Sequence, residues 1–193
     1  MEITNYGENA ENLYAILNPL ICTEEALLMK RFIQHGSITT FDHCVRVATL
    51  SYLINRHFKL NADERSLIRG AFLHDFFLYD WHDPTQHKRF HGFHHPMTAA
   101  LNAEKYYKIN DKEKNIITSH MWPLTLRNIP RYKEAAIVCV ADKICSAEEV
   151  LQPRSSICLD PETIIRSKNF SKGSLMKAAA LLLYFTSAFQ RPC

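Results

Sequence analysis

Residues 37–58 read SITTFDHCVRVATLSYLINRHF, and this stretch is the strongest indication of the fold. Its apolar residues recur every three or four positions, which places them along one face of an α-helix. Thr39 or Thr40 can cap the start of this helix, and we expect its end at about His57. His43 lies on the apolar face, so its ring is expected to point toward the core.

Helical patterns continue on both sides of this stretch. A first helical region covers about residues 8–34 and can break at Pro19. Further helices are expected over about residues 62–77, 96–107, 131–151 and 173–190, and in a segment that ends near His120. Residues 79–94 are polar, aromatic and histidine-rich and are expected to form a loop, and residues 152–172 an extended connection.

Two of these helices have a recognisable start. Asn61 with Glu64, and Asn110 with Glu113, have the spacing of a capping box. Pro96 suits the first turn of the helix that it precedes. Because the chain shows no sustained strand-like alternation, it is predicted to be all-α. We expect one domain over residues 1–193, a bundle of roughly six to eight helices.

Composition excludes several classes of function. The 193 residues are 47% hydrophobic and 22% charged, which is ordinary for a globular protein. A net charge of +3 does not demand a nucleic-acid partner, and five glycines leave no glycine-rich phosphate loop. The longest apolar run, residues 178–189, is shorter than the ~20 residues that a membrane span needs. It is therefore expected to be a packed helix, and no membrane association is predicted.

The six cysteines form no CxxC pair, and the N-terminal residues lack the apolar core of a signal peptide. We therefore expect reduced thiols and a cytoplasmic protein.

Several ionisable residues lie on apolar helix faces. His43, Asp75, His120 and Asp142 each share a face with aliphatic residues three, four or seven positions away. A lone buried carboxylate would cost several kcal/mol, and a metal ion bound by imidazoles and carboxylates would remove that cost. The alternatives are a satisfied core histidine at position 43 and an ion pair of Asp142 with Arg46 or a lysine.

The order of these residues resembles a known signature. His43 is followed by the adjacent His74 and Asp75 in FLHDF, and then by Asp142 in VADKI. This is similar to the H…HD…D signature of the HD-domain superfamily of metal-dependent phosphohydrolases. The flanking sequences TTFDHCVRVA and RGAFLHDF also resemble the metal helices of that family. The resemblance covers about residues 35–151.

The resemblance implies a helical fold in which His43, His74, Asp75 and Asp142 bind one divalent ion. Some branches of the family add two histidines and a second ion, and His95 and His120 match those positions. We therefore expect two ions of Fe, Mn, Co, Zn or Ni, with Mg as an alternative. Otherwise His95 caps its helix and His120 supports the site or contacts substrate.

One departure from the family concerns substrate phosphate. Many relatives follow the HD pair with an Ile-Gly-Lys segment, whereas this chain reads HDFFLYDW. The candidates for phosphate contact are therefore other cations, with surface charges as the alternative interpretation: Arg46, Lys88, Arg89 and Lys143. Nearby aromatic residues can stack on a nucleobase or simply anchor loops: Trp81, Phe90, Phe93 and Trp122. The loop histidines are expected to face solvent: His82, His87 and His91.

The resemblance implies hydrolysis of a phosphate ester or anhydride by metal-activated hydroxide, with Asp75 as a bridge between two ions. The expected partner is a small phosphorylated, nucleotide-like substrate. Two alternatives stay open: an HD-fold diiron oxygenase, since histidine and carboxylate ligands serve both chemistries, and a non-catalytic sensor or scaffold stabilised by its metal. The sequence leaves the substrate, the metal and the oligomeric state open.

Overall fold

The structure is a computed structural model that describes residues 6–83, 85 and 91–151. The helices are α1 (Tyr6–Ile21), α2 (Glu24–Leu28), α3 (Thr40–His57), α4 (Glu64–Leu73), α5 (His91–Tyr107), α6 (Asp111–Ser119) and α7 (Lys133–Leu151), with a short 3₁₀ helix, η1 (Met29–Arg31). Two short strands, β1 (Ile33–His35) and β2 (Ile38–Thr39), complete the described part. The prediction of an all-α fold is confirmed. The expected helix over 173–190 lies outside the described residues.

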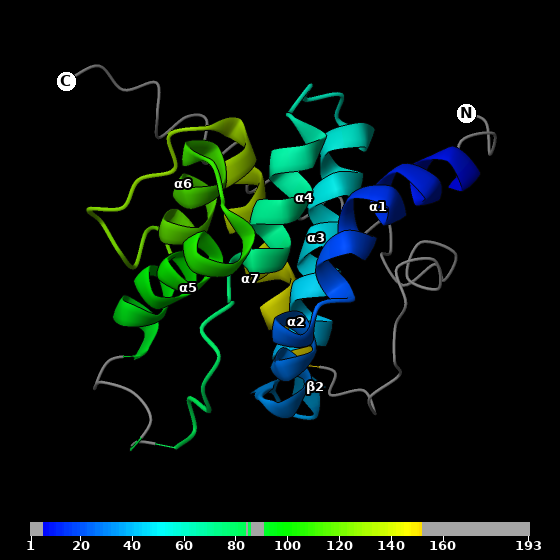
Figure 1. Cartoon of the computed structure of the whole chain (residues 1–193). Helices are drawn as coiled ribbons and strands as arrows, with labels where there is room; N and C mark the ends of the chain where they lie inside the picture. The colour runs from blue at the N-terminus through cyan, green and yellow to red at the C-terminus, as the bar shows by residue number, and fades with distance from the viewer. Residues whose placement is uncertain (1–5, 84, 86–90, 152–193) are drawn as a thin grey trace.

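Helices α3 and α4 lie side by side at the centre of the molecule (Figure 1). Helix α7 packs against α3, α4 and α6, while α5 packs against α6 and α1 against α4. The largest fully buried side chains include Tyr52, Phe72 and Phe76, which come from the central helices and the turn after α4. None of the described helices is long and apolar enough to cross a membrane.

Helix α3 begins and ends where its sequence predicts. The Thr39 hydroxyl accepts a hydrogen bond from the backbone N–H of Asp42 and so caps the helix. His43 lies one turn further on and is fully buried, as its position on the apolar face predicts. The cap therefore fixes the helical register that brings His43 into the core.

Helix α4 differs from its prediction at both ends. Its N-cap is Asp63, whose carboxylate accepts the N–H of Ser66, whereas Asn61 has a left-handed backbone with φ of 50°. The helix ends at Leu73 and not at about Phe77. Asn102 of α5 donates hydrogen bonds to the carbonyls of residues 76 and 77 at 3.0 and 3.1 Å. Those carbonyls are thus satisfied by another helix, and Asp75 lies in a turn.

Helix α5 also begins earlier than predicted. It starts at His91, inside the segment that was expected to be a loop, so Pro96 lies within the helix and not in its first turn. The capping box predicted at Asn110 and Glu113 is present in both directions, and α6 ends at Ser119 as expected. Local capping chemistry was therefore a reliable guide for α6 but not for α5.

The N-terminal helical region is interrupted in a way that the sequence did not predict. Pro19 lies inside α1, which ends at Ile21, and Thr23 caps a separate helix, α2. Strands β1 and β2 then form a short antiparallel pair around Gly36, whose φ of 57° suits a glycine. This pair contacts α3 and α7 and lies next to the buried polar cluster.

Candidate metal centre

The structure brings together all six side chains that the sequence singled out as metal ligands. His43 comes from α3, His95 from α5 and Asp142 from α7, while His74, Asp75 and His120 lie at the ends of α4 and α6. All six are buried: His43, His74, Asp75, His95, His120 and Asp142. Side chains from five helical segments therefore converge on one interior point.

One half of the cluster is built around Asp142. Its Oδ1 lies 3.2 Å from His43 Nε2 and 3.7 Å from His74 Nε2. The Oδ2 atom of Asp75 lies 3.5 Å from His74 Nε2 and 4.0 Å from His43 Nε2. These are the four residues of the H…HD…D pattern.

The other half is built around the second oxygen of Asp75. Its Oδ1 lies 3.1 Å from His95 Nε2 and 3.4 Å from His120 Nε2. The two imidazole Nε2 atoms are 2.8 Å apart. Asp75 thus presents one oxygen to each half of the cluster.

The residues fit a bound cation. Among the described residues, His43 Nε2, His74 Nε2 and Asp75 Oδ1 are buried without a hydrogen-bond partner, and such groups are costly unless something satisfies them. Three overlapping sets have ligand atoms within 4.8 Å of one another: His43, His74 and Asp75; His74, His120 and Asp142; and Asp75, His95 and His120. Imidazole and carboxylate donors suit zinc and other first-row transition metals.

The charges in the cluster also suit ligands. Burial raises the pKa of Asp75, but the neighbouring His74 and His95 outweigh it, and the pKa lies well below its ordinary value. For Asp142, burial is likewise outweighed by the adjacent imidazoles of His43 and His74, so its pKa is also well below the usual range. Burial lowers the pKa of His120 to about 3. The carboxylates are therefore ionised and the His120 ring is neutral near pH 7.

Hydrogen bonds fix which ring nitrogen faces the site. His74 Nδ1 donates to the carbonyl of Ala71, and His120 Nδ1 donates to that of Ile117, both at 2.7 Å. Because a carbonyl can only accept, each Nδ1 carries a proton, and Nε2 is the ring nitrogen that faces the site and can bind a cation. His43 Nδ1 has a different partner, the Glu149 carboxylate at 2.8 Å.

The cations predicted to contact phosphate have distinct surroundings. Arg46 points to α7, where its guanidinium lies 3.4 Å from Glu149 Oε1 and 3.6 Å from Glu148 Oε2. Lys143 Nζ donates to the carbonyls of His120 and Cys139 at 3.0 and 3.3 Å. Lys143 also lines a cavity beside the cluster.

A cavity of about 580 Å³ lies beside the cluster. Its wall is formed by the segment after His120 and by α7: Met121, Pro123, Leu124, Asp142, Lys143 and Ser146. The Ser146 hydroxyl donates to Asp142 Oδ1 at 3.2 Å. The cavity therefore joins a predicted metal ligand to an apolar surface with one lysine on it.

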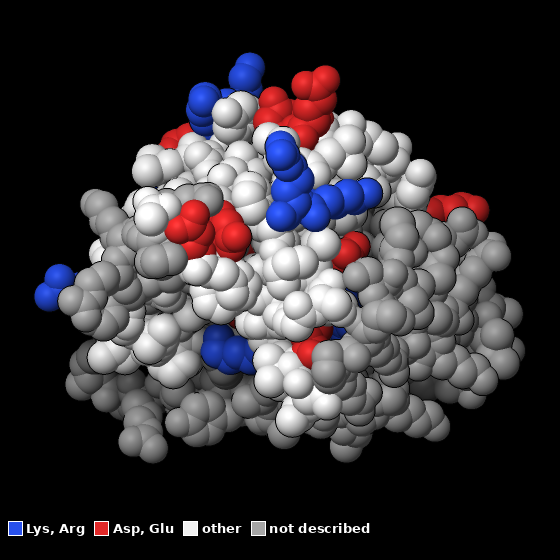
Figure 2. Space-filling model, turned by 90° about the horizontal axis from the view of Figure 1, so that it is seen from below, with Lys and Arg blue, Asp and Glu red and all other residues white. Residues whose placement is uncertain are grey.

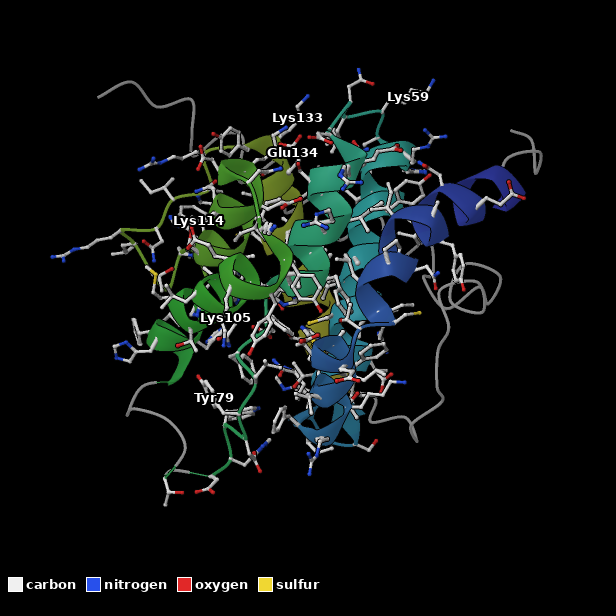
Figure 3. The ribbon with its side chains drawn as sticks, viewed as in Figure 1. Lys59, Tyr79, Lys105, Lys114, Lys133 and Glu134 are labelled. Carbon is white, nitrogen blue, oxygen red and sulfur yellow. The ribbon has the colours of Figure 1, made fainter. Side chains whose placement is uncertain are left out.

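The aromatic segment after the HD pair lies close to the cluster. The Tyr79 ring packs at a tilt against Phe77, and Phe77 contacts the His95 ring edge to face. Burial, followed by the Asp75 charge, raises the pKa of Tyr79 to about 12, so the phenol keeps its proton. In Figure 3, Tyr79 lies at the end of the molecule opposite Lys59 and Lys133.

The remaining sequence candidates contribute less to the site. Trp81 Nε1 donates to the carbonyl of Ile33 at 3.1 Å, and His82 is exposed beside Asp80. Phe93 is half exposed, while Trp122 packs against the core. Four candidates lie outside the described residues, namely His87, Lys88, Arg89 and Phe90, and the backbone of His91 begins α5.

Two residues at the site were not singled out from the sequence. Gln34 of β1 donates from Nε2 to Asp75 Oδ2 at 2.6 Å, and its own Oε1 accepts from Thr40 at 3.2 Å. Glu149 is the partner of His43. It lies seven residues after Asp142 and so on the same face of α7, a spacing that makes it recognisable in hindsight. Gln34 had no such signal, because its place depends on the strand pair.

Comparison with known proteins agrees with the geometry. The family model of the HD domain matches residues 40–147, which is more than half of the chain and includes all six candidate ligands. No curated protein and no solved structure matched the chain. Gln34 and Glu149 both lie outside the matched range. With the helical fold, the clustered His and Asp side chains and this match, the chain belongs to the HD domain family.

Proposed function

We propose that this protein is a metal-dependent phosphohydrolase that cleaves a phosphate ester or anhydride in a nucleotide-like substrate and uses two divalent ions. The observation that carries the proposal is the position of Asp75. Its Oδ2 faces His43 and His74, and its Oδ1 faces His95 and His120. A buried carboxylate with histidines at both oxygens is suited to join two cations.

Each group of the chain has a definite task in this proposal. A bound divalent ion polarises a phosphoryl oxygen and lowers the pKa of bound water. Asp142 and His43 hold one half of the centre, His95 and His120 the other, and Asp75 both. Lys143 places a positive charge on the wall of the adjacent cavity, where it can attract a substrate phosphate.

The cavity supports a small organic phosphate as the substrate. Its volume of about 580 Å³ is in the range of ordinary small-molecule sites. Met121, Pro123 and Leu124 offer an apolar wall to a nucleoside or similar group, next to the polar Asp142 and Lys143. The organic part of a ligand would thus contact the apolar wall, and its phosphate would lie near Asp142 and Lys143.

The surface supports a small substrate over a nucleic acid. Figure 2 shows the lower face of the molecule, on which the coloured Lys and Arg side chains are interspersed with Asp and Glu. They form no broad basic area among the described residues of that face, whereas nucleic-acid binding usually relies on clustered basic side chains.

The test is metal analysis of protein purified without chelator, followed by a phosphate-release screen. The substrates are nucleoside monophosphates, triphosphates, dinucleotides and simple phosphomonoesters, with Mn²⁺, Co²⁺, Fe²⁺, Ni²⁺, Zn²⁺ and Mg²⁺ added separately. We expect release with at least one transition metal and none from the Asp75→Ala protein. Absence of release combined with oxygen uptake by the iron-loaded protein would identify an oxygenase. Bound metal with neither activity would identify a sensor or scaffold.

A further inference from the structure

The four histidines of the centre are not all oriented by the same kind of group. His74 and His120 donate from Nδ1 to main-chain carbonyls three residues earlier in their own segments. His43 donates from Nδ1 to a side chain, the Glu149 carboxylate, which comes from a different helix. A substitution can remove the partner of His43, whereas the main-chain partners of the other two stay in place.

Glu149 is buried as deeply as the ligands themselves. Its side chain and that of His43 are both fully buried, and their Oε2–Nδ1 distance is 2.8 Å. An isolated carboxylate in such a place is strongly disfavoured. Its second oxygen, Oε1, lies 3.4 Å from Arg46 Nε, so one carboxylate joins an imidazole and a guanidinium.

The helical spacing explains how this contact forms. Glu149 lies two turns after Asp142 on the same face of α7, and Arg46 lies one turn after His43 on α3. Where α3 and α7 pack together, one helix supplies a predicted ligand and the carboxylate that orients another ligand. Arg46 is held here by Glu148 and Glu149, and Glu149 contacts Nδ1 of His43 whereas Asp142 lies near its Nε2.

We infer that Glu149 is a positioning residue that sets the metal affinity of one half of the centre, the half held by His43 and Asp142. Its effect on the half held by His95 and His120 is smaller. The inference rests on the proposed metal centre. With its proton kept on Nδ1 by Glu149, His43 presents the Nε2 lone pair to the cation, and the buried negative charge strengthens it as a donor. Arg46 balances that charge and is a structural partner of Glu149.

The experiment is a titration of metal-free, full-length protein with Mn²⁺ or Co²⁺ alone. Calorimetry measures the binding, and metal analysis gives the number of bound ions. His43→Ala and His120→Ala proteins assign the observed binding steps to the two halves. In Glu149→Gln the amide oxygen still accepts the Nδ1 proton but the charge is gone, and we expect the His43 half to bind about 10-fold more weakly. In Glu149→Ala both the hydrogen-bond acceptor and the charge are gone, and the loss of metal affinity in the His43 half should approach about 100-fold.

Glu148→Gln is the matched control. Glu148 is the neighbouring residue on α7 and also pairs with Arg46, whereas the carboxylate bonded to His43 Nδ1 is that of Glu149. The metal affinities of Glu148→Gln should stay within about 3-fold of the wild type. That change is well below the loss of affinity expected when a residue that orients a ligand is removed. Metal-free melting temperatures measured alongside report any general loss of structure.

Three results would overturn the inference. One is unchanged affinity in Glu149→Ala, another is an equal loss in both halves, and the third is an equal effect of Glu148→Gln. A lower melting temperature with unchanged affinities would show that Glu149 is merely structural. Because the titration uses no substrate, a wild-type protein that binds metal but releases no phosphate would refute the hydrolase proposal and leave this test valid.

Discussion

The Asp75 carboxylate contacts His95 of a different helix, with Asp75 Oδ1 and His95 Nε2 separated by 3.1 Å. His95 comes from α5, while Asp75 lies in the turn that ends α4. The other oxygen of Asp75 faces His74 and His43. This single side chain therefore connects the two halves of the cluster.

We expect a two-ion centre that can be reduced to one ion. The double variant His95→Ala, His120→Ala removes both imidazoles that face Asp75 Oδ1 and leaves the His43, His74 and Asp142 side intact. It should retain one ion and lose most phosphate release. In the wild type the two ions should lie about 3.5–4 Å apart, the usual spacing of two-metal sites. Metal analysis and a metal-bound crystal structure provide the measurements.

A single ion in that crystal structure, with the His120 ring turned away from it, would contradict the two-ion prediction. The phosphohydrolase proposal would then stand on the remaining four residues.

Removal of Asp75 should have a larger effect than removal of either outer histidine. Asp75→Ala and His74→Ala should each lose bound metal and abolish phosphate release, because each residue belongs to two of the three overlapping ligand sets. The metal-loaded protein gains stability from binding, so these variants should also melt at lower temperature in the presence of metal. Full metal content and activity in Asp75→Ala would show that the site is elsewhere.

The stability of the metal-free protein should fall when the pH is lowered. The pKa of His120 is about 3 in the folded protein and 6.5 in its unperturbed state. The unfolded chain therefore takes up this proton first, and stability declines as the pH falls from about 6.5 toward 3. The pKa values of Asp75 and Asp142 lie below the unperturbed 3.8. Their contribution is present above that value and is lost as the pH falls further.

Stability should also fall on the alkaline side of this range. Burial lowers the pKa of both His43 and His74. The Glu149 carboxylate beside His43 and the Asp75 carboxylate beside His74 outweigh burial, so both pKa values lie well above 6.5. Their contribution is complete below 6.5 and disappears as the pH rises through the folded pKa. Melting temperatures in chelator at several pH values test both slopes, and His120→Asn should flatten the acid slope between 6.5 and 4. A melting temperature independent of pH would contradict both assignments.

Gly70 is expected to be intolerant of a larger side chain. A Cβ atom at this position in α4 would lie 2.6 Å from Ile116 Cδ1 and 3.0 Å from Ile116 Cβ on α6. Gly70→Ala gains up to ~1 kcal/mol of helix propensity, but overpacking of this kind costs about 1–3 kcal/mol. We expect net destabilisation, measured by urea unfolding. The double variant with Ile116→Val, which removes Cδ1, should recover part of the loss, and a more stable Gly70→Ala protein would show that α4 and α6 can separate without cost.

Much of the fold follows from local features of the sequence. Thr39 and the Asn110–Glu113 pair cap their helices as predicted, because a cap depends on residues three positions apart. The apolar periodicity of α3 and α7 predicted which faces are buried, and so it identified His43 and Asp142 as interior residues. These features need no knowledge of any distant part of the chain.

The errors occurred where a distant residue decides the local structure. Helix α4 ends four residues earlier than predicted, since Asn102 of α5 takes up the carbonyls of residues 76 and 77. The turn that results allows Asp75 to face two groups of histidines, whereas the sequence alone had placed it on a continuous helix. The early start of α5 at His91 was missed for a different reason, because residues 91–94 resemble a loop in composition.

The sequence by itself determined the helical class, the chemical types of the buried side chains and their order along the chain from His43 to Asp142, since these depend on periodicity and residue type. Only the tertiary structure decided their partners. It placed Gln34 against Asp75 and Glu149 against His43, and it directed Arg46 to Glu149 and not to the cavity. The physical reason is that hydrogen bonds and ion pairs between helices depend on how those helices pack, and a local pattern carries no information about packing distances of 3 to 4 Å.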